Sequence, residues 1–144
     1  MNIYPEVTVG AVIINSEGKI FLMHSPKWKG KYVCPGGHIE LGETAEEALI
    51  REIKEETNLN ITDIQFLLYQ QFIFDPSFWE KKHFIFLDFS CQTQDNAVIL
   101  NDEGSDFIWI NPTEIDKYDI EPYTRKSIEA YLELKKSHQD KINS

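Results

Sequence analysis

The sequence predicts an α/β fold, in which several strands, one central helix and one terminal helix form a single layered unit. Two observations predict the layers: runs of β-branched and aromatic residues typical of strands lie on both sides of a helix, and capping residues mark both ends of that helix. A third is that the 144 residues contain no linker, repeat or low-complexity segment. We therefore expect one domain over residues 1–144, since this length suffices for one stable core.

An antiparallel hairpin is expected near the start of the chain. Residues 7–14 and 19–24 are apolar and rich in β-branched side chains, which is typical of strands. Asn15 and Gly18 lie between them and supply the chemistry of a tight turn. Two strands joined by so short a turn pair with each other in opposite directions.

A loop is predicted after this hairpin. Residues 25–37 mix proline, glycine and lysine and have too little periodicity for a regular element. Within them, residues 32–34 are suited to a brief strand. The loop is expected to end at Gly36-Gly37, because paired glycines are mostly a turn signal.

The central helix is expected over residues 44–58. Thr44 and Glu47 have the spacing of a capping box, in which each side chain accepts a hydrogen bond from the backbone of the other residue. Asn58 stands where a left-handed residue ends a helix, and the apolar Leu59 follows it. Both helix ends are therefore marked in the sequence.

Three further strands are predicted. Residues 61–74 are apolar and aromatic enough for one long or bent strand, and residues 83–93 form the next, with a turn between them. Residues 106–110 make a short strand. A helical turn then begins at 111–115, where Pro112 occupies an early position that a helix tolerates.

The terminal helix is expected to pack through one apolar face and to fray at its end. Lys135 and Lys136 suit the negative end of the helix dipole, which places the helix terminus close to them. Residues 137–144 are expected to fray. The packing face consists of residues spaced at i, i+3 and i+4: Ile128, Tyr131 and Leu132.

Composition excludes several classes of function. With 14 basic and 24 acidic residues the formal net charge is -10, which argues against a nucleic-acid polymer as partner, because such binding neutralises many phosphates with Lys and Arg. No apolar run approaches the length of a membrane span, and the first residues do not resemble a secretory signal. We expect a cytoplasmic protein with no membrane partner. Cys34 and Cys91 have no metal-like spacing and are expected to be reduced thiols.

An unusual concentration of acid lies in residues 37–59, which hold seven glutamates against one arginine and one lysine. At 100° per residue, Glu52, Glu55 and Glu56 share an arc of roughly 100° on the helix. Glu55 and Glu56 also occupy the last turn, where the helix dipole disfavours anions. A solvated face is one interpretation. A bound divalent cation is the other, since it removes the repulsion, and Mg²⁺ suits carboxylate ligands and phosphate substrates.

The apolar side of this helix lies next to the acids. Leu49, Ile50 and Ile53 fall at about 40°, 140° and 80° on the same helical projection, beside the arc of glutamates. They are expected to pack on the sheet. The acids therefore border the core.

The same segment resembles the signature of the Nudix hydrolases, G-x5-E-x7-R-E-U-x-E-E-x-G-U, in which U is a bulky aliphatic residue. Asn58 stands where the family has glycine, but asparagine also adopts the left-handed conformation, so the helix end should be kept. The box covers about a sixth of the chain. The matching residues are Gly37, Glu43, Arg51, Glu52, Ile53, Glu55, Glu56 and Leu59.

The resemblance implies a Nudix-type α/β/α sandwich around a mixed β-sheet. It also implies Glu52, Glu55 and Glu56 as metal ligands, with the Gly37 carbonyl as an additional one. The cofactor would be Mg²⁺, with Mn²⁺ as a possible substitute. Arg51 and Glu43 would form an orienting pair.

Two segments outside the box extend the resemblance. Residues 101–115 resemble a segment that in many members places a further acid near the metals, and Glu103 is the residue at that place. Either Glu52 or Glu103 would then be the catalytic base. Residues 114–128 look like the C-terminal segment of the bacterial nucleoside triphosphatase branch, which favours a nucleoside triphosphate as substrate.

The predicted function is therefore metal-dependent hydrolysis of a nucleoside diphosphate linked to X, and for a nucleoside triphosphate the products are the monophosphate and pyrophosphate. The alternatives are a nucleotide-sugar or ADP-ribose-type pyrophosphatase and a non-catalytic nucleotide-binding module. The partner is expected to be a small nucleotide, and the protein a monomer or a homodimer. Most buried aromatic residues belong to the core, and a loop histidine usually faces solvent. Aromatic residues that could instead stack on a base are Tyr32, Phe74, Phe78 and Trp79, and His38 could touch phosphate.

Overall fold

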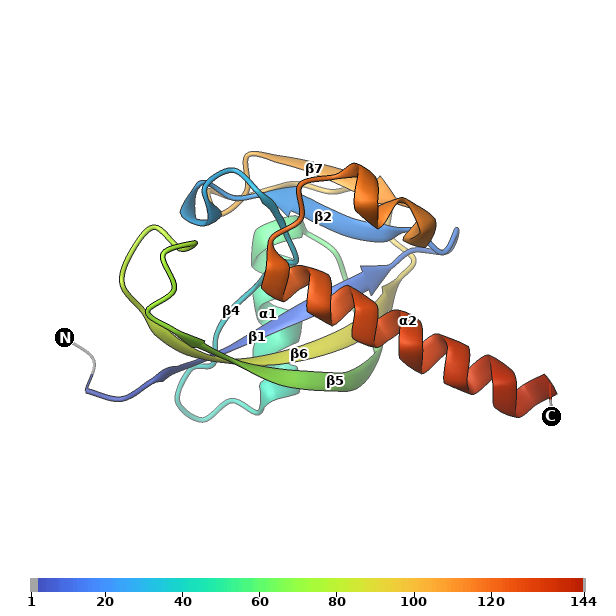
Figure 1. Cartoon of the computed structure of the whole chain (residues 1–144), viewed down its shortest axis with the longest axis horizontal. Helices are drawn as coiled ribbons and strands as arrows, with labels where there is room; N and C mark the ends of the chain where they lie inside the picture. Colours follow the sequence, from blue (N-terminus) through green and yellow to red (C-terminus); the bar gives the residue numbers. More distant parts are fainter. Residues whose placement is uncertain (1–2, 144) are drawn as a thin grey trace.

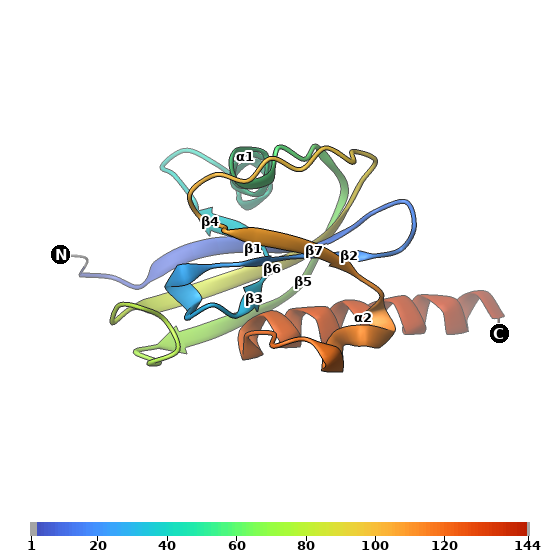
Figure 2. The ribbon, with the colours of Figure 1, turned by 90° about the horizontal axis from the view of Figure 1, so that it is seen from above.

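The computed structural model describes residues 3–143 (Figure 1). Its two α-helices lie on opposite sides of one β-sheet, which Figure 2 shows from above. Two short 3-10 helices cover Pro26–Trp28 and Pro112–Lys117. The other elements, in chain order, are β1 Glu6–Ile14, β2 Ile20–His24, β3 Tyr32–Val33, β4 Gly36–His38, α1 Ala45–Thr57, β5 Ile61–Ile73, β6 His83–Thr93, β7 Asp106–Ile110 and α2 Pro122–Asn143.

The sheet is mixed, as the sequence predicts. Its main path runs β3-β2-β1-β6-β5, while β4 pairs with β1 and β7 pairs with β2. The pairing of β1 with β6 is parallel, and the other pairings are antiparallel. With one helix on each face, this confirms the expected α/β/α sandwich.

The expected N-terminal hairpin is confirmed, but the end of the predicted loop is wrong. Gly36-Gly37 belongs to β4, a strand that pairs antiparallel with β1 through Val9↔Gly37 and Gly10↔Gly36. A Cβ at Gly36 would lie 2.0 Å from the carbonyl oxygen of Val9. Glycine is therefore present because two backbones approach closely, whereas sequence patterns associate a glycine pair with a turn.

The central helix α1 is confirmed with both predicted caps. The Thr44 hydroxyl accepts a hydrogen bond from the Glu47 amide, the Glu47 carboxylate accepts one from the Thr44 amide, and Asn58 has a φ of 68°. Ile53 is buried. The expectation for Ile50 is wrong, since 47% of it is exposed. At about 140° on the helix it lies beyond the edge that reaches the sheet.

The core has two parts, one on each face of the sheet. On the α1 side, Val9, Ala11 and Ile13 of β1 pack with Ile53, and on the α2 side Val12 and Ile14 pack with Ile128. Successive side chains of a strand point to opposite faces. The continuous apolar run of β1 therefore reflects a strand that is buried on both faces.

The terminal helix is longer than predicted. Its expected packing face is confirmed, because Ile128 is fully buried and Tyr131 and Leu132 pack beside it. The expectation of a frayed tail is wrong over 137–143, which continue as helix, while residue 144 lies outside the described residues. These residues include no glycine or proline, so the sequence contains no residue that would break the helix before 143.

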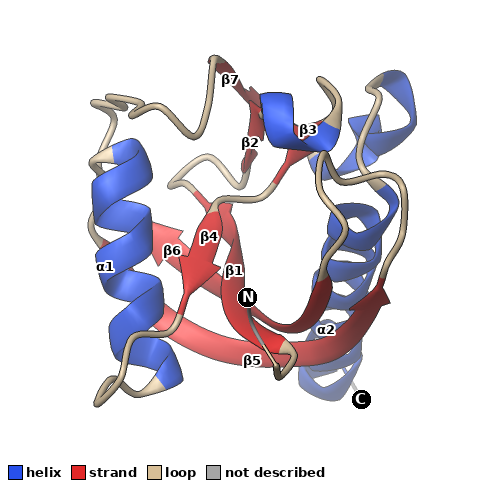
Figure 3. Ribbon diagram, turned by 90° about the vertical axis from the view of Figure 1, so that its left-hand side faces the viewer, coloured by secondary structure: helices blue, strands red, loops and turns tan. Residues whose placement is uncertain are grey.

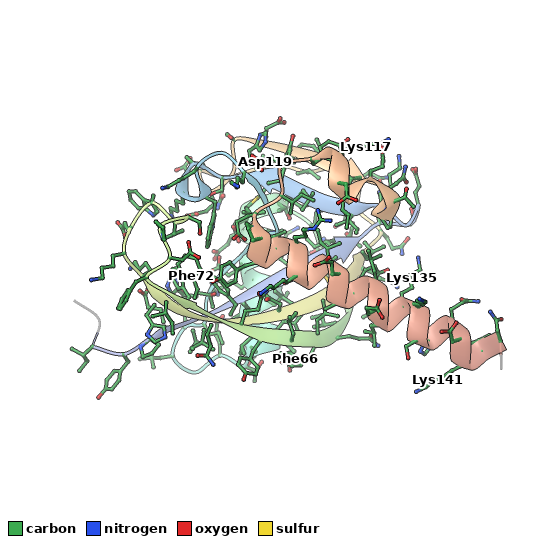
Figure 4. All side chains as sticks on the ribbon, viewed as in Figure 1. Phe66, Phe72, Lys117, Asp119, Lys135 and Lys141 are labelled. Atoms are coloured by element: carbon green, nitrogen blue, oxygen red, sulfur yellow. The ribbon has the colours of Figure 1, made fainter. Side chains whose placement is uncertain are left out.

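The end of α2 projects beyond the sheet (Figure 4), and Lys135 and Lys141 extend from this part. Lys141, and not Lys135 or Lys136, occupies the last turn. In the part of the chain that the structure describes, neither helix has the length and apolarity needed to cross a membrane.

Candidate active site

A cavity of about 250 Å³ lies where both helical layers reach the sheet, close to the lower limit of small-molecule sites. The α1 side contributes Glu52 and Glu56, and the α2 side contributes Glu121 and Ser127. Figure 3 shows α1 and α2 on either side of the strands that bring these residues together. Strand β4 brings its glycines to the same cavity.

The three acids predicted as metal ligands differ in their surroundings. Glu56 is 2% exposed and Glu52 has a side chain that is 17% exposed, and both line the cavity. The Glu55 side chain is 55% exposed and does not line it. The structure thus brings two of the three to the cavity wall and leaves Glu55 beside them.

The glycine pair of β4 lies directly against these carboxylates. The Gly36 amide donates a hydrogen bond to Oε2 of Glu56 over 3.0 Å. A Cβ at Gly37 would lie 2.3 Å from Oε2 of Glu52. Only a residue without a side chain permits this approach, so the strand that was predicted as a loop end shapes the acidic wall.

The surroundings of the acidic wall favour the neutral forms of Glu52 and Glu56. Burial, followed by the charges of Glu52 and Glu103, raises the pKa of Glu56 to about 9. Burial also raises the pKa of Glu52, against the opposing effect of Arg51. A divalent cation would stabilise both carboxylates in their charged forms. Carboxylate oxygens beside a backbone carbonyl are suitable ligands for Mg²⁺.

Within the described residues, no group of three His, Cys, Asp or Glu side chains converges closely enough to hold a metal ion. Arg51 binds two of the acids of the box. Its Nη1 donates to Glu52 over 2.9 Å and to Glu55 over 3.4 Å, so two of the acids turn towards the guanidinium. The Glu55 side chain is 55% exposed, so packing does not hold it in one rotamer.

Arg51 and Glu43 form the predicted pair. Nε and Nη2 of Arg51 donate to the two oxygens of Glu43 over 2.7 and 2.8 Å, and Nη2 also donates to the His38 carbonyl. This bidentate bond lowers the pKa of Glu43 to about 2. Arg51 therefore connects α1, the segment before it and the Glu52 carboxylate.

Glu103 also lines the cavity. Its carboxylate accepts a hydrogen bond from Lys27 over 3.0 Å, and both side chains are 41% exposed. Its charge is among the causes that raise the pKa of Glu56. The acid predicted from outside the box is thus brought to the same site.

A model of the NUDIX domain matches residues 4–131. The chain belongs to the Nudix hydrolase family. This confirms the resemblance, together with the prediction of an enzyme that hydrolyses phosphoanhydride bonds. Proteins named nucleoside triphosphatase NudI from Escherichia coli and Salmonella dublin are each 33% identical to this Nudix hydrolase over 105 residues, which cover 69% of this chain and 74% of each relative.

Solved structures agree with the fold of this Nudix hydrolase. A NUDIX hydrolase from Nitrosomonas europaea aligns with a TM-score of 0.73 at 27% identity, covering 89% of this chain and 88% of that one. A MutT NUDIX hydrolase from Burkholderia pseudomallei gives 0.75 at 22%, covering 88% and 98%. The NUDIX domain of Shewanella oneidensis NrtR, solved with ADP ribose, gives 0.75 at 19%, covering 90% and 88%.

The aromatic residues singled out from the sequence are mostly elsewhere in this Nudix hydrolase. Phe78 lines the cavity, whereas Tyr32, Phe74 and Trp79 do not. Tyr32 instead stacks on His24, with ring centroids 3.7 Å apart. His38 does line the cavity, and its Nε2 lies 2.7 Å from a carboxylate oxygen of Glu6.

Several residues of the cavity were missed by the sequence reasoning. Most of them lie on the α2 side of the cavity or are aromatic, and one of them carries a sequence signal. That one is Asp88, a single acid within the apolar run of β6, where an unpaired charge is costly. The missed residues are Lys27, Trp28, Phe84, Phe86, Asp88, Glu121, Tyr123 and Ser127.

Proposed function

We propose that this Nudix hydrolase is a metal-dependent pyrophosphohydrolase that cleaves a nucleoside diphosphate linked to X. Its proposed substrate is a ribo- or deoxyribonucleoside triphosphate, cleaved to the monophosphate and pyrophosphate. The observation that carries the proposal is Glu56, a buried carboxylate beside Glu52 and the β4 backbone. The relatives named nucleoside triphosphatase support the triphosphate as substrate.

Mg²⁺ is the proposed cofactor, and Mn²⁺ is a chemically similar substitute. The proposed ligands are the carboxylates of Glu52, Glu55 and Glu56 and the carbonyl of Gly37. When bound, the cation polarises the phosphoryl oxygens and neutralises their charge. A divalent cation also explains how a protein with a net charge of -10 binds a polyanionic substrate.

Each remaining site residue has a proposed role of its own. Arg51 positions the carboxylate of Glu52 while Glu43 fixes the guanidinium by the bidentate bond. The proton of the attacking water passes to either Glu52 or Glu103, since both line the cavity. A salt bridge with Lys27 holds the Glu103 carboxylate at this cavity.

The alternative substrate class is a nucleotide sugar or an ADP-ribose-type dinucleotide. The NrtR domain solved with ADP ribose has a similar fold and favours testing this class. A non-catalytic nucleotide-binding module is a weaker alternative, because every glutamate of the box is present. The cytoplasmic location, the absence of a nucleic-acid polymer as partner and the choice between monomer and homodimer stay predictions.

The proposal is tested with a panel of nucleoside triphosphates, deoxynucleoside triphosphates, nucleotide sugars and dinucleotides, each incubated with Mg²⁺ and analysed for products. A monophosphate and pyrophosphate from a triphosphate are the expected products. A sugar phosphate plus a nucleotide would instead establish the alternative class. Absence of turnover on the whole panel would refute both enzymatic proposals.

A further inference from the structure

The α2 side of the cavity carries a second pair of acids, separate from the acidic wall of α1. Asp88 extends from β6, and Glu121 precedes the first residue of α2. Both line the cavity. The charge of Glu121 acts on Asp88, whereas the charges that act on Glu56 come from Glu52 and Glu103. The cavity therefore has two distinct acidic ends.

Glu121 has one carboxylate oxygen with no partner. The residue is 2% exposed, and its Oε2 accepts a hydrogen bond from the Thr124 amide over 3.0 Å, which caps α2. Its Oε1 is buried and accepts no hydrogen bond from any residue within 3–143. An unsatisfied buried acceptor is costly, and here it belongs to a residue that lines a cavity.

The side-chain donors of Gln70 and Ser127, which lie beside Asp88, are already engaged within the protein. The Gln70 amide donates to Oδ2 of Asp88 over 3.0 Å and to the Tyr123 carbonyl over 2.8 Å, so its hydrogens are used. The Ser127 hydroxyl lies 3.3 Å from the same carbonyl and donates to it. A ligand that satisfies this end of the cavity must therefore bring N–H or O–H donors.

An aromatic wall adjoins the two acids. The rings of Phe86 and Tyr123 have centroids 5.7 Å apart, and Phe84 stacks on Phe86 at 5.5 Å. Phe78 and Trp28 continue the wall, with centroids 4.7 Å apart. All five residues line the cavity. A wall of aromatic rings beside hydrogen-bonding groups suits a flat heteroaromatic ring, such as a nucleobase.

We propose that Asp88 and Glu121 determine which base the enzyme accepts, by receiving hydrogen bonds from adjacent N–H donors on guanine. This inference rests on the proposed nucleoside triphosphate activity and names its substrate class. Guanine presents N1–H next to its 2-amino group, which matches two acceptors. Uracil and thymine have one N–H between two carbonyls, and adenine and cytosine have a ring acceptor beside the amino group. In each case an acceptor atom of the base would face a carboxylate oxygen and be repelled by it.

The decisive comparison is between GTP and ITP, which differ only in the 2-amino group. The values of kcat/KM with Mg²⁺ are measured for GTP, ITP, ATP, CTP and UTP. We expect GTP to exceed ITP by about tenfold or more, because ITP leaves a buried acceptor unpaired. Binding of GMP and IMP is measured in parallel by calorimetry in metal-free buffer, and the same order is expected.

Two substitutions test the residues themselves. Glu121→Gln keeps an oxygen to cap α2 but places an amino group in the cavity, so the ratio of GTP to ITP should fall close to one. Asp88→Asn should also reduce the ratio of GTP to ITP. This second variant keeps the test valid if Glu121→Gln does not fold. The matched control is Glu114→Gln, since Glu114 also caps a helix by accepting from the Asn111 amide but does not line the cavity.

Equal values for GTP and ITP would overturn the inference, as would preference for another base or an unchanged ratio in both variants. Turnover of triphosphates without this preference would leave the proposed function intact. Binding of GMP over IMP without any turnover would refute the proposed function and support the base preference. Neither binding nor turnover would overturn both.

Discussion

The two acidic ends of the cavity are built in different ways. Glu52 and Glu56 lie one turn apart on α1, so a local repeat in the sequence places them on the same side. Asp88 and Glu121 come from a strand and a helix start that are distant in the sequence. The α1 end can therefore be recognised from a sequence motif, whereas the α2 end forms only when the chain folds. The signature identifies the chemistry of the family, whereas the base selectivity proposed here depends on residues outside the signature.

Loss of the acid at the α1 end should have the largest effect. Glu56→Gln removes the charge of a proposed metal ligand but keeps the bond from the Gly36 amide, so kcat should fall about 10³-fold, which corresponds to about 4 kcal/mol. Steady-state kinetics measure this loss, and circular dichroism checks the fold. Glu46→Gln on the exposed side of the same helix is the control. Turnover of Glu56→Gln at the wild-type rate would contradict the metal site.

Mg²⁺ should stabilise the protein through the same end. At a concentration one hundred times its Kd, a ligand that binds only the folded state adds about 2.7 kcal/mol to the free energy of unfolding. Thermal unfolding with and without Mg²⁺ measures this gain. It should largely disappear in Glu56→Gln and persist in Glu46→Gln. A gain of equal size in both variants would place the cation elsewhere.

The two glycines of β4 should separate activity from stability. Gly37→Ala directs a Cβ at the Glu52 carboxylate, which has to move, so kcat should fall about tenfold to a hundredfold with a small change in stability. Gly36→Ala directs a Cβ at the backbone of Val9 and should cost about 1 to 3 kcal/mol of folding free energy. Steady-state kinetics and denaturant unfolding are measured for both variants. A loss of stability in Gly37→Ala together with a loss of kcat alone in Gly36→Ala would contradict this geometry.

A change at the α2 end should have the smallest effect. There the charged carboxylate of Asp88 lowers the free energy of unfolding near neutral pH. Burial and the charge of Glu121 raise the pKa of Asp88 from its ordinary value of 3.8 to about 6. The folded state therefore binds this proton more tightly than the unfolded state does. The contribution of Asp88 to the free energy of unfolding is fully present below about pH 4 and is lost as the pH rises through about 6.

Asp88→Asn removes this titration. In metal-free buffer it should raise the free energy of unfolding at pH 7 by on the order of 1 kcal/mol and have no advantage at pH 4. Denaturant unfolding of both proteins across this range measures the difference. A variant that is less stable than the wild type at pH 7 would show that the carboxylate is stabilising.

Most of the fold was predictable because its signals are local. The caps at Thr44 and Asn58, the hairpin and the long strands depend on residues close in sequence. The errors at Ile50 and Gly36-Gly37 concern contacts with other elements, which no local pattern records. The extension of α2 beyond Lys136 is a different error, since the helix continues through exposed residues that include no glycine or proline to end it.

The sequence by itself determined the family, the sandwich fold and the acids of the α1 end, because a helix places residues at fixed spacing on one side. The tertiary structure alone decided that Glu56 is buried, that Glu55 is left outside the cavity and that Arg51 lies between the acids. It also decided the α2 end, where Asp88 and Glu121 meet only after the sheet and α2 have packed. Burial and the convergence of distant residues are properties of packing, and spacing along the chain does not encode them locally.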